Sequence, residues 1–425
     1  MKKLGREEAV MDHNKKPWYA FLLSRIPQNR PLPVSAEAET ESNAEEEAPP
    51  AKGIVDVPFL LITAALVLFG CVMIYSASYV FAQKHHDEST YFIARHLLFL
   101  FLSVGFTFFV VKFCTPLFWR DFAYIFYGIS VFLLILVMTP LGVDLNSGAQ
   151  RWLDLKIFTL QPSELAKLAL VLTLARFMST HEKQVMSTHR FGGNFKYGVF
   201  YPGCLIAGVG GLVAIEPHVS GLLIIGLLGA SVMFMGGTRM KWIVAIGGVI
   251  VAAFLLLIIL FPHAMARMDT WINIEDADPL GSAWQTLQGL MAIGSGGLFG
   301  TGLGNSRQKY GYVSQPQNDF IFTIVCEELG FIGALLVIGL FVAFIWRGFY
   351  IARHAPDKCS ALMVYGLTAK VALQVLLNIA VVTNTIPNTG ISLPFFSYGG
   401  TSLMLQIFEV GIILSISRYA THKKI

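Results

Sequence analysis

The polar side chains best suited to chemistry lie at the start of an apolar stretch, residues 315–333. Helical spacing would place Asp319, Thr323 and Glu327 on one face of this stretch. An ionised side chain in hydrocarbon costs at least ~2.5 kcal/mol, so this face should line a bundle interior or a hydrated cavity. It is either a structural cluster that holds helices together or part of a functional site, and the stretch alone favours neither.

A second group of polar residues lies in the segment 146–167. Arg151 and Trp152 offer a guanidinium suited to a phosphate and an indole suited to a sugar or to the lipid–water interface. Glu164 and Lys167 follow in the first turns of a helix that a proline opens. A charged pair at the membrane edge is costly unless it faces a hydrated cavity, so this pair either supports the architecture or belongs to a substrate groove.

A glycine-rich run follows the amphipathic segment 282–293, which carries Gln285 on its polar side. The glycines within 294–304 could wrap the oxygens of a ligand, although glycines that pack helices together look the same in a sequence. Arg307 and Lys309 come directly after this run. Cations beside flexible backbone amides are what a diphosphate requires, so the run favours an anion site.

Prolines and glycines also interrupt residues 383–402, which would otherwise span a membrane. Broken backbone at membrane depth is tolerated only against protein or water. We therefore expect this stretch, the 146–167 segment and Asp319 to enclose a cavity open to one side of the membrane.

Glu216 and His218 form either a metal-ligand fragment or, more commonly for such a pair, a hydrogen-bonded corner. No metalloprotease, serine-hydrolase, P-loop or zinc-finger spacing is present, so we assign no metal site.

Composition defines the elements that must position these residues. The 425-residue chain is 55% hydrophobic and only 14% charged, with a mean hydropathy of +0.61. These values are typical of an all-α integral membrane protein and give nucleic-acid binding no support. Residues 1–53, rich in Glu, Ala and Pro, are predicted to be a disordered cytoplasmic tail, and 54–425 to be one polytopic membrane domain.

About ten apolar segments are long enough to cross the bilayer. They lie near 57–80, 93–113, 121–142, 161–179, 197–215, 218–236, 241–262, 319–346, 360–384 and 398–419. Most of the 31 Lys and Arg residues fall on one side of this arrangement, even without the tail. The positive-inside rule then predicts that both termini are cytoplasmic and that the long connection 263–318, between helices 7 and 8, is extracytoplasmic.

Four long motifs resemble a known family. The segments NSGAQRWLDL with QPSELAK, GSGGLFGTGLGNSRQKYGYV, QNDFIFTIVCEELGFIG and IPNTGISLPFFSYGGTSL look like the signatures of the SEDS proteins, the FtsW/RodA/SpoVE family. The resemblance covers 57–419. Two departures stand out, because many members have a Pro and a Glu where this chain has Ser314 and Gln315, and an Asp where it has His218.

The resemblance implies an inverting peptidoglycan glycosyltransferase of the bacterial cytoplasmic membrane, which polymerises undecaprenyl-diphosphate-linked lipid II on the outer face during cell division. It places the family's essential aspartate on Asp319, which we assign as general base, with Arg151, Arg267 and Lys309 as candidates for the phosphates. Substrate contacts are also assigned to Trp152, Glu164, Lys167, Gln285, Asn318 and Ser397. The long tail favours the division branch over the elongation and sporulation branches.

The implied partners are a class B penicillin-binding protein, which acts as transpeptidase, and other division or elongation membrane proteins. No cofactor is specified, and a divalent cation at the diphosphate stays open. Two alternatives remain. A lipid II flippase would use the same cavity, and a division scaffold that recruits the penicillin-binding protein would not need Asp319 at all.

Overall fold

The structure is a computed structural model, and it describes residues 53–144, 150–156, 158–187, 194–216, 218–260, 265, 268–269, 271–274, 281 and 283–420. Apart from Gly53, the predicted tail 1–53 lies outside these residues, so its disorder stays a prediction.

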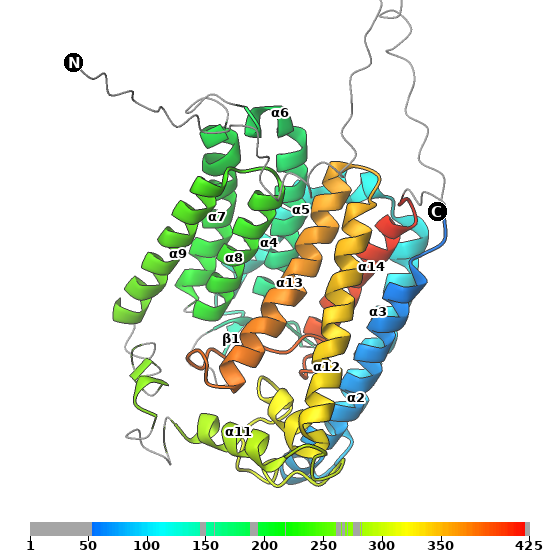
Figure 1. Cartoon of the computed structure of the whole chain (residues 1–425), viewed down its shortest axis with the longest axis vertical. Helices are drawn as coiled ribbons and strands as arrows, with labels where there is room; N and C mark the ends of the chain where they lie inside the picture. The colour runs from blue at the N-terminus through cyan, green and yellow to red at the C-terminus, as the bar shows by residue number, and fades with distance from the viewer. Residues whose placement is uncertain are drawn as a thin grey trace, which may run out of the picture. The chain divides into compact units, whose positions relative to one another are not determined.

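Every segment predicted to span the membrane is helical (Figure 1). The helices are α2 (Val57–His86), α3 (Tyr91–Phe113), α4 (Pro116–Val137), α5 (Pro162–Thr180), α7 (Tyr201–Ile215, after the π-helical turn η1, Lys196–Phe200), α8 (Val219–Met235), α9 (Met240–Leu260), α12 (Ile321–Arg353), α13 (Lys358–Val382) and α14 (Gly400–Ser417). Within the described residues, seven helices are long and apolar enough to cross a membrane, counting η1 with α7, and α8 and the first part of α9 are shorter apolar helices. The protein is therefore a multi-pass, mostly helical membrane protein.

A small antiparallel sheet departs from the all-α prediction. Strands β1 (Gly142–Val143), β2 (Trp152–Asp154) and β3 (Thr159–Leu160) pair in the order β1-β2-β3. Thr401, at the start of α14, donates its hydroxyl to the carbonyl of Thr159 at 2.8 Å. The sheet thus fixes the segment that carries Trp152 against the helical bundle.

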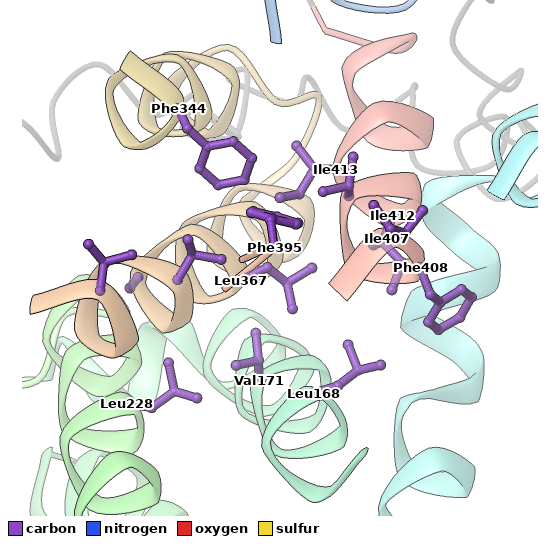
Figure 2. Close-up of a cluster of buried hydrophobic side chains, with 14 of the residues drawn as sticks. Leu168, Val171, Leu228, Phe344, Leu367, Phe395, Ile407, Phe408, Ile412 and Ile413 are labelled. Carbon is purple, nitrogen blue, oxygen red and sulfur yellow. The ribbon is translucent and has the colours of Figure 1, made fainter. Parts of the chain in front are cut away.

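The core lies where α13 packs against α5, α8 and α12, and where α14 packs against α3. Figure 2 shows buried apolar side chains from these helices, among them Leu168, Leu367 and Ile413, pointing toward one another. Glycines allow close approach of the helices. A Cβ on Gly366 of α13 would lie 2.5 Å from Val171 of α5, and one on Gly348 of α12 would lie 2.4 Å from Thr368 of α13. Such small residues are the usual basis of helix packing inside membranes.

Helix α12 is broken near its start, which corrects the prediction of a continuous polar face from Asp319. The helix begins only at Ile321, and Gly330 inside it has φ 67° and ψ −166°. The glycine-rich run packs into this break: a Cβ on Gly300 would lie 2.2 Å from the carbonyl oxygen of Glu328, and one on Gly330 would lie 2.3 Å from the nitrogen of Gly300. In the structure these glycines let two stretches of backbone pack closely against each other. The run therefore follows the alternative in which the glycines serve helix packing.

The two helix carboxylates next to this break bind the loop that precedes α12. Glu327 accepts from the hydroxyl of Ser306 at 2.5 Å and from the amide of Arg307 at 2.8 Å. Glu328 accepts from the amide of Ser306 at 3.3 Å and also from the hydroxyl of Ser76 in α2 at 2.5 Å. Both carboxylates are buried and satisfy polar groups of the same connection, in agreement with the structural role that their position in α12 suggests.

Candidate functional site

Asp319 occupies the last turn before α12, and its main chain is held by a buried side chain of α13. The Nδ2 atom of Asn378 donates to the carbonyl of Asp319 at 2.8 Å and to the carbonyl of Ile391 at 2.7 Å. Gly390, with φ 67°, lies against the carboxylate, and a Cβ there would be 3.6 Å from Oδ2 of Asp319. The Asp319 side chain itself is half-buried. Its position is therefore set through backbone contacts that do not consume the carboxylate.

The stretch after α13 holds the main chain of the two residues that precede Asp319. The hydroxyl of Ser397 donates to the carbonyl of Asn318 at 2.7 Å and accepts from the amide of Leu393 at 2.7 Å. The amide of Tyr398 donates to the carbonyl of Gln317 at 2.8 Å. The structure thus brings Asn318 and Ser397 together with Asp319. The Ser397 hydroxyl serves the main chain here, so it positions the loop.

Helix α11 (Trp284–Ser295) packs beside the aspartate. A Cβ on Gly289 would lie 2.8 Å from the ring of Phe320, the residue after Asp319. Trp284 fixes the start of this helix, because its indole donates to the carbonyl of Tyr312 at 2.6 Å. Gln285 is half-buried on this helix, which leaves its assignment to substrate as a proposal.

Glu164 and Lys167 belong to a larger buried network than the sequence indicates. The Lys167 ammonium lies 2.5 Å from Oε1 of Glu164, and Lys370 of α13 lies 3.4 Å from Oε2 of the same carboxylate. Lys370 also lies 2.6 Å from Glu409 of α14. Two lysines and two glutamates therefore form one network, buried at the junction of α5, α13 and α14. The sequence reasoning paired only Glu164 with Lys167, although the rarity of ionisable residues inside helices is a signal that could have linked all four.

A corner between α7 and α8 carries the third group of polar residues. The Nε atom of Arg151 donates to the main-chain carbonyl of Glu216 at 3.4 Å, and Nδ1 of His218 lies 3.5 Å from the Ser163 hydroxyl. These contacts fit a hydrogen-bonded corner. Ser220, in the first turn of α8, donates its hydroxyl to the carbonyl of Thr389 at 2.8 Å, which joins the corner to the stretch beside Asp319.

The corner residues lie outside the spanning helices, and burial changes their acidity. Burial raises the pKa of Glu216 to about 7, although the nearby Arg151 guanidinium acts in the opposite direction. Burial, together with the positive charges of Arg151 and Lys167, lowers the pKa of His218 to about 3. At neutral pH the imidazole is therefore uncharged, while Glu216 exists in both protonation states.

Lys309 is not placed where a diphosphate could reach it. Its ammonium is within 2.8 Å of Glu328, donates to the carbonyl of Gly304 at 2.7 Å, and lies 3.4 Å from the Ser76 hydroxyl. The residue is 1% exposed. The assignment of Lys309 to the phosphates is therefore corrected: the break in α12 turns the loop back, so that this lysine neutralises a buried carboxylate.

Of the remaining predicted site residues, the structure describes Trp152 but not Arg267. Trp152 is half-buried in β2, in register with Val143, on the segment that also carries Arg151. Arg267 lies outside the described residues, and so does Pro217. Among the described residues, no group of three or more His, Cys, Asp or Glu side chains is arranged to hold a metal ion.

These features define a multi-pass helical membrane protein in which broken segments from distant parts of the chain meet around one aspartate, together with a buried network of paired charges. The chain belongs to the FtsW/RodA/SpoVE family, because the model of that family, described as "Cell cycle protein", matches residues 57–422.

Named relatives agree with this membership. The stage V sporulation protein E of Bacillus subtilis (strain 168) is 40% identical over 371 residues, which cover 86% of this chain and 98% of that protein. A probable peptidoglycan glycosyltransferase FtsW of Trichlorobacter lovleyi is 36% identical over 362 residues, which cover 85% of this chain and 93% of that protein.

Solved structures share the fold. The crystal structure of the rod shape determining protein RodA of Thermus thermophilus matches with a TM-score of 0.63 at 26% identity, covering 87% of this chain and 98% of that one. A chain from a structure described as "Structural coordination of polymerization and crosslinking by a peptidoglycan synthase complex" matches with a TM-score of 0.69 at 26% identity, covering 87% of this chain and 99% of that one.

Proposed function

We propose that this protein is a peptidoglycan glycosyltransferase that polymerises lipid II, with Asp319 as general base. The observation that carries the proposal is the placement of Asp319. Three main-chain clamps from Asn378, Ser397 and Tyr398 fix its turn, and the residue is half-buried at the meeting point of broken segments. Relatives named as peptidoglycan glycosyltransferases match along most of the chain.

In the proposed reaction the 4-hydroxyl of an acceptor sugar attacks the anomeric carbon of the growing chain with inversion. Asp319 takes the hydroxyl proton as the new carbon–oxygen bond forms, and the bond to undecaprenyl diphosphate breaks with its electron pair on the leaving oxygen. A base needs hydrogen-bond reach of its proton, and a firmly held main chain that carries a half-exposed aspartate provides that reach. The developing negative charge on the diphosphate needs cations close by.

Arg151 is our candidate for the diphosphate, since it lies at the corner joined to the Asp319 segment through Ser220 and Thr389. Arg267 stays a candidate from the sequence. Glu164 and Lys167 already satisfy each other within the buried network, so we propose that they shape the site and contact substrate only at its edge. A divalent cation, if it takes part, would be held mainly by the diphosphate, and its apparent affinity should then depend on lipid II concentration.

The catalytic face is proposed to be extracytoplasmic. The helix ends opposite Asp319 carry cations such as Lys112, Arg176 and Lys358, as the positive-inside rule requires of cytoplasmic ends.

We also propose a class B penicillin-binding protein as partner, supported by the likeness to a chain of a peptidoglycan synthase complex. On the long N-terminal tail we propose a role in cell division, so depletion of the protein should give filaments, whereas rounded cells would indicate elongation.

The test is polymerisation of lipid II by purified protein. Asp319→Asn should remain folded, because Asn378 binds its carbonyl and not its carboxylate, and should form no glycan polymer. Asp269→Asn is the matched control, since it removes an exposed acid from the same long connection and should polymerise normally. Polymerisation by Asp319→Asn would refute the base assignment.

The same assay separates the alternatives. A flippase would move lipid II across vesicles without forming polymer, and a scaffold would show neither activity while still binding the penicillin-binding protein. Running the assay with and without the cognate transpeptidase distinguishes polymerisation by this chain from activation of its partner.

A further inference from the structure

Glu216 is a buried acid whose side chain the proposed reaction does not use. It follows the last residue of α7 and is 4% exposed. Neither carboxylate oxygen has a hydrogen-bond partner among the described residues. Buried carboxylates are normally paired or hydrogen-bonded, because desolvation of an unsatisfied acid is costly. An acid left in this condition needs an explanation.

The neighbour that explains it is Arg151. The guanidinium donates to the main-chain carbonyl of Glu216 at 3.4 Å, so it already lies at this residue, and its positive charge acts on the Glu216 carboxyl. Arg151 is also the proposed cation for the diphosphate. Two anions, one belonging to the protein and one to the substrate, therefore compete for the same guanidinium.

The other charged groups around the corner do not offer Glu216 an alternative partner. Lys167 lies 2.5 Å from Glu164, and Glu164 also pairs with Lys370. His218 has a pKa lowered to about 3 by burial and nearby cations, so it is neutral throughout the physiological range. Asp319 lies across the Thr389–Gly390 stretch and is itself an acid. Arg151 is thus the cation in contact with Glu216 among these groups.

We propose that Glu216 is a positioning residue that controls whether Arg151 is available to the diphosphate of lipid II. When Glu216 is ionised, its carboxylate attracts the guanidinium and opposes an incoming dianion. When Glu216 is protonated, the guanidinium can turn to the diphosphate, and the neutral acid no longer repels it. The inference rests on the proposed function, which supplies the diphosphate, and deepens it by adding a proton-linked control of donor binding.

The linkage has a definite sign. A diphosphate that takes Arg151 leaves Glu216 without its nearby cation, so binding favours the protonated acid and should be accompanied by proton uptake. Because burial raises the pKa of Glu216 to about 7, its ionised fraction changes most between pH 6 and pH 8. If the ionised form fully blocks Arg151, the apparent Kd rises by up to about tenfold over this interval.

The experiment measures binding of lipid II in detergent to protein carrying Asp319→Asn, which removes turnover and one titrating acid. The diphosphate diester of lipid II keeps its charge between pH 6 and pH 8, so a change in Kd reports on the protein. We expect the Kd to rise several-fold from pH 6 to pH 8 with Glu216 present. In the Glu216→Gln background it should be low and equal at the two pH values.

A double-mutant cycle then tests whether the effect passes through Arg151. In the Arg151→Gln background, binding should be weak at both pH values and Glu216→Gln should change nothing further. Asp121→Asn is the control for loss of an acid, since the carboxylate of this exposed residue lies 3.5 Å from the neighbouring Arg120 and its loss should keep the pH dependence of the parent.

Two results would overturn the proposal: the same pH dependence with Gln at 216 as with Glu, or an undiminished effect of Glu216→Gln when Arg151 is absent. Failure of the proposed function would look different, because lipid II would bind with the predicted pH dependence while the protein with Asp319 intact formed no polymer. No binding of lipid II at either pH would refute both.

Discussion

Replacing Asn378 by leucine should separate the placement of Asp319 from its chemistry. Asn378 is fully buried, and its amide group donates to the carbonyls of Asp319 and Ile391 at 2.8 and 2.7 Å. Leucine has a similar shape but donates nothing, so both carbonyls lose this partner. An unsatisfied buried carbonyl costs about 1–3 kcal/mol, which gives a loss of stability of about 2–6 kcal/mol for the pair.

The effect on catalysis should exceed what this loss of stability explains. Because the turn that carries Asp319 is no longer tied to α13, its carboxylate should move by a fraction of an ångström to about 1 Å, and misplacement on this scale can cost about 100-fold in rate. We expect kcat for lipid II polymerisation to fall by about 10- to 100-fold with a smaller change in KM. Thermal unfolding of the purified protein should show a Tm lower by several degrees.

The matched control is Asn305→Ala. Asn305 is exposed and donates a single hydrogen bond to the carbonyl of Thr301 at 3.2 Å, so both Tm and kcat should stay near the parent values. The reasoning would be wrong if Asn378→Leu lowered the Tm but left kcat unchanged, since the amide would then stabilise the fold without positioning the aspartate.

Three further predictions concern the surroundings of the site. Lys309→Met should lower stability by about 3–5 kcal/mol because it leaves the buried carboxylate of Glu328 without its cation, and adding Glu328→Gln should recover part of this loss in a thermal unfolding assay. Gly330→Ala should lower both Tm and polymerisation, because φ is 67° and the new Cβ would lie 2.3 Å from Gly300, whereas Gly339→Ala on the same helix meets nothing within 4 Å and should be neutral. For Glu216 the folded pKa of about 7 lies above the ordinary 4.5, so stability is lost as pH rises from 4.5 through 7; Glu216→Gln should therefore gain stability over the parent at pH 8 relative to pH 5, by at most about 3 kcal/mol. An equal difference in Tm at both pH values would show that Glu216 does not titrate in this range.

Most of the helices could be predicted from the sequence because seven of the described helices have the length and hydropathy that a bilayer demands. The small sheet could not, since strands such as Gly142–Val143 are too short to show any periodicity. Asp319, Arg151 and the Glu164–Lys167 pair were identified by residue type, and the structure adds Lys370 and Glu409 to that pair.

Lys309 and the glycine-rich run were misassigned for one physical reason. A cation after flexible glycines has the composition of an anion site, but the sequence does not show that Gly330 leaves helical geometry and lets the run pack against α12. Once the loop folds back, Lys309 meets Glu328 and its charge is neutralised inside the protein. Residue types therefore indicated which groups are charged, whereas the break in the helix determined which of them pair.

The hydrogen bonds that hold the Asp319 turn leave no sign in the sequence. Their acceptors are main-chain carbonyl oxygens, which every residue carries. Asn378 and Ser397 bind the backbone at Asp319 and Asn318. This arrangement places the aspartate firmly through hydrogen bonds that do not use its carboxylate. The network of Glu164, Lys167 and Lys370 shows the opposite solution, in which the charged groups themselves hold the helices together and are consumed in doing so. A group that must exchange a proton with substrate is expected to be held through its main chain, and this is the reason for proposing Asp319, and not Glu164, as the base.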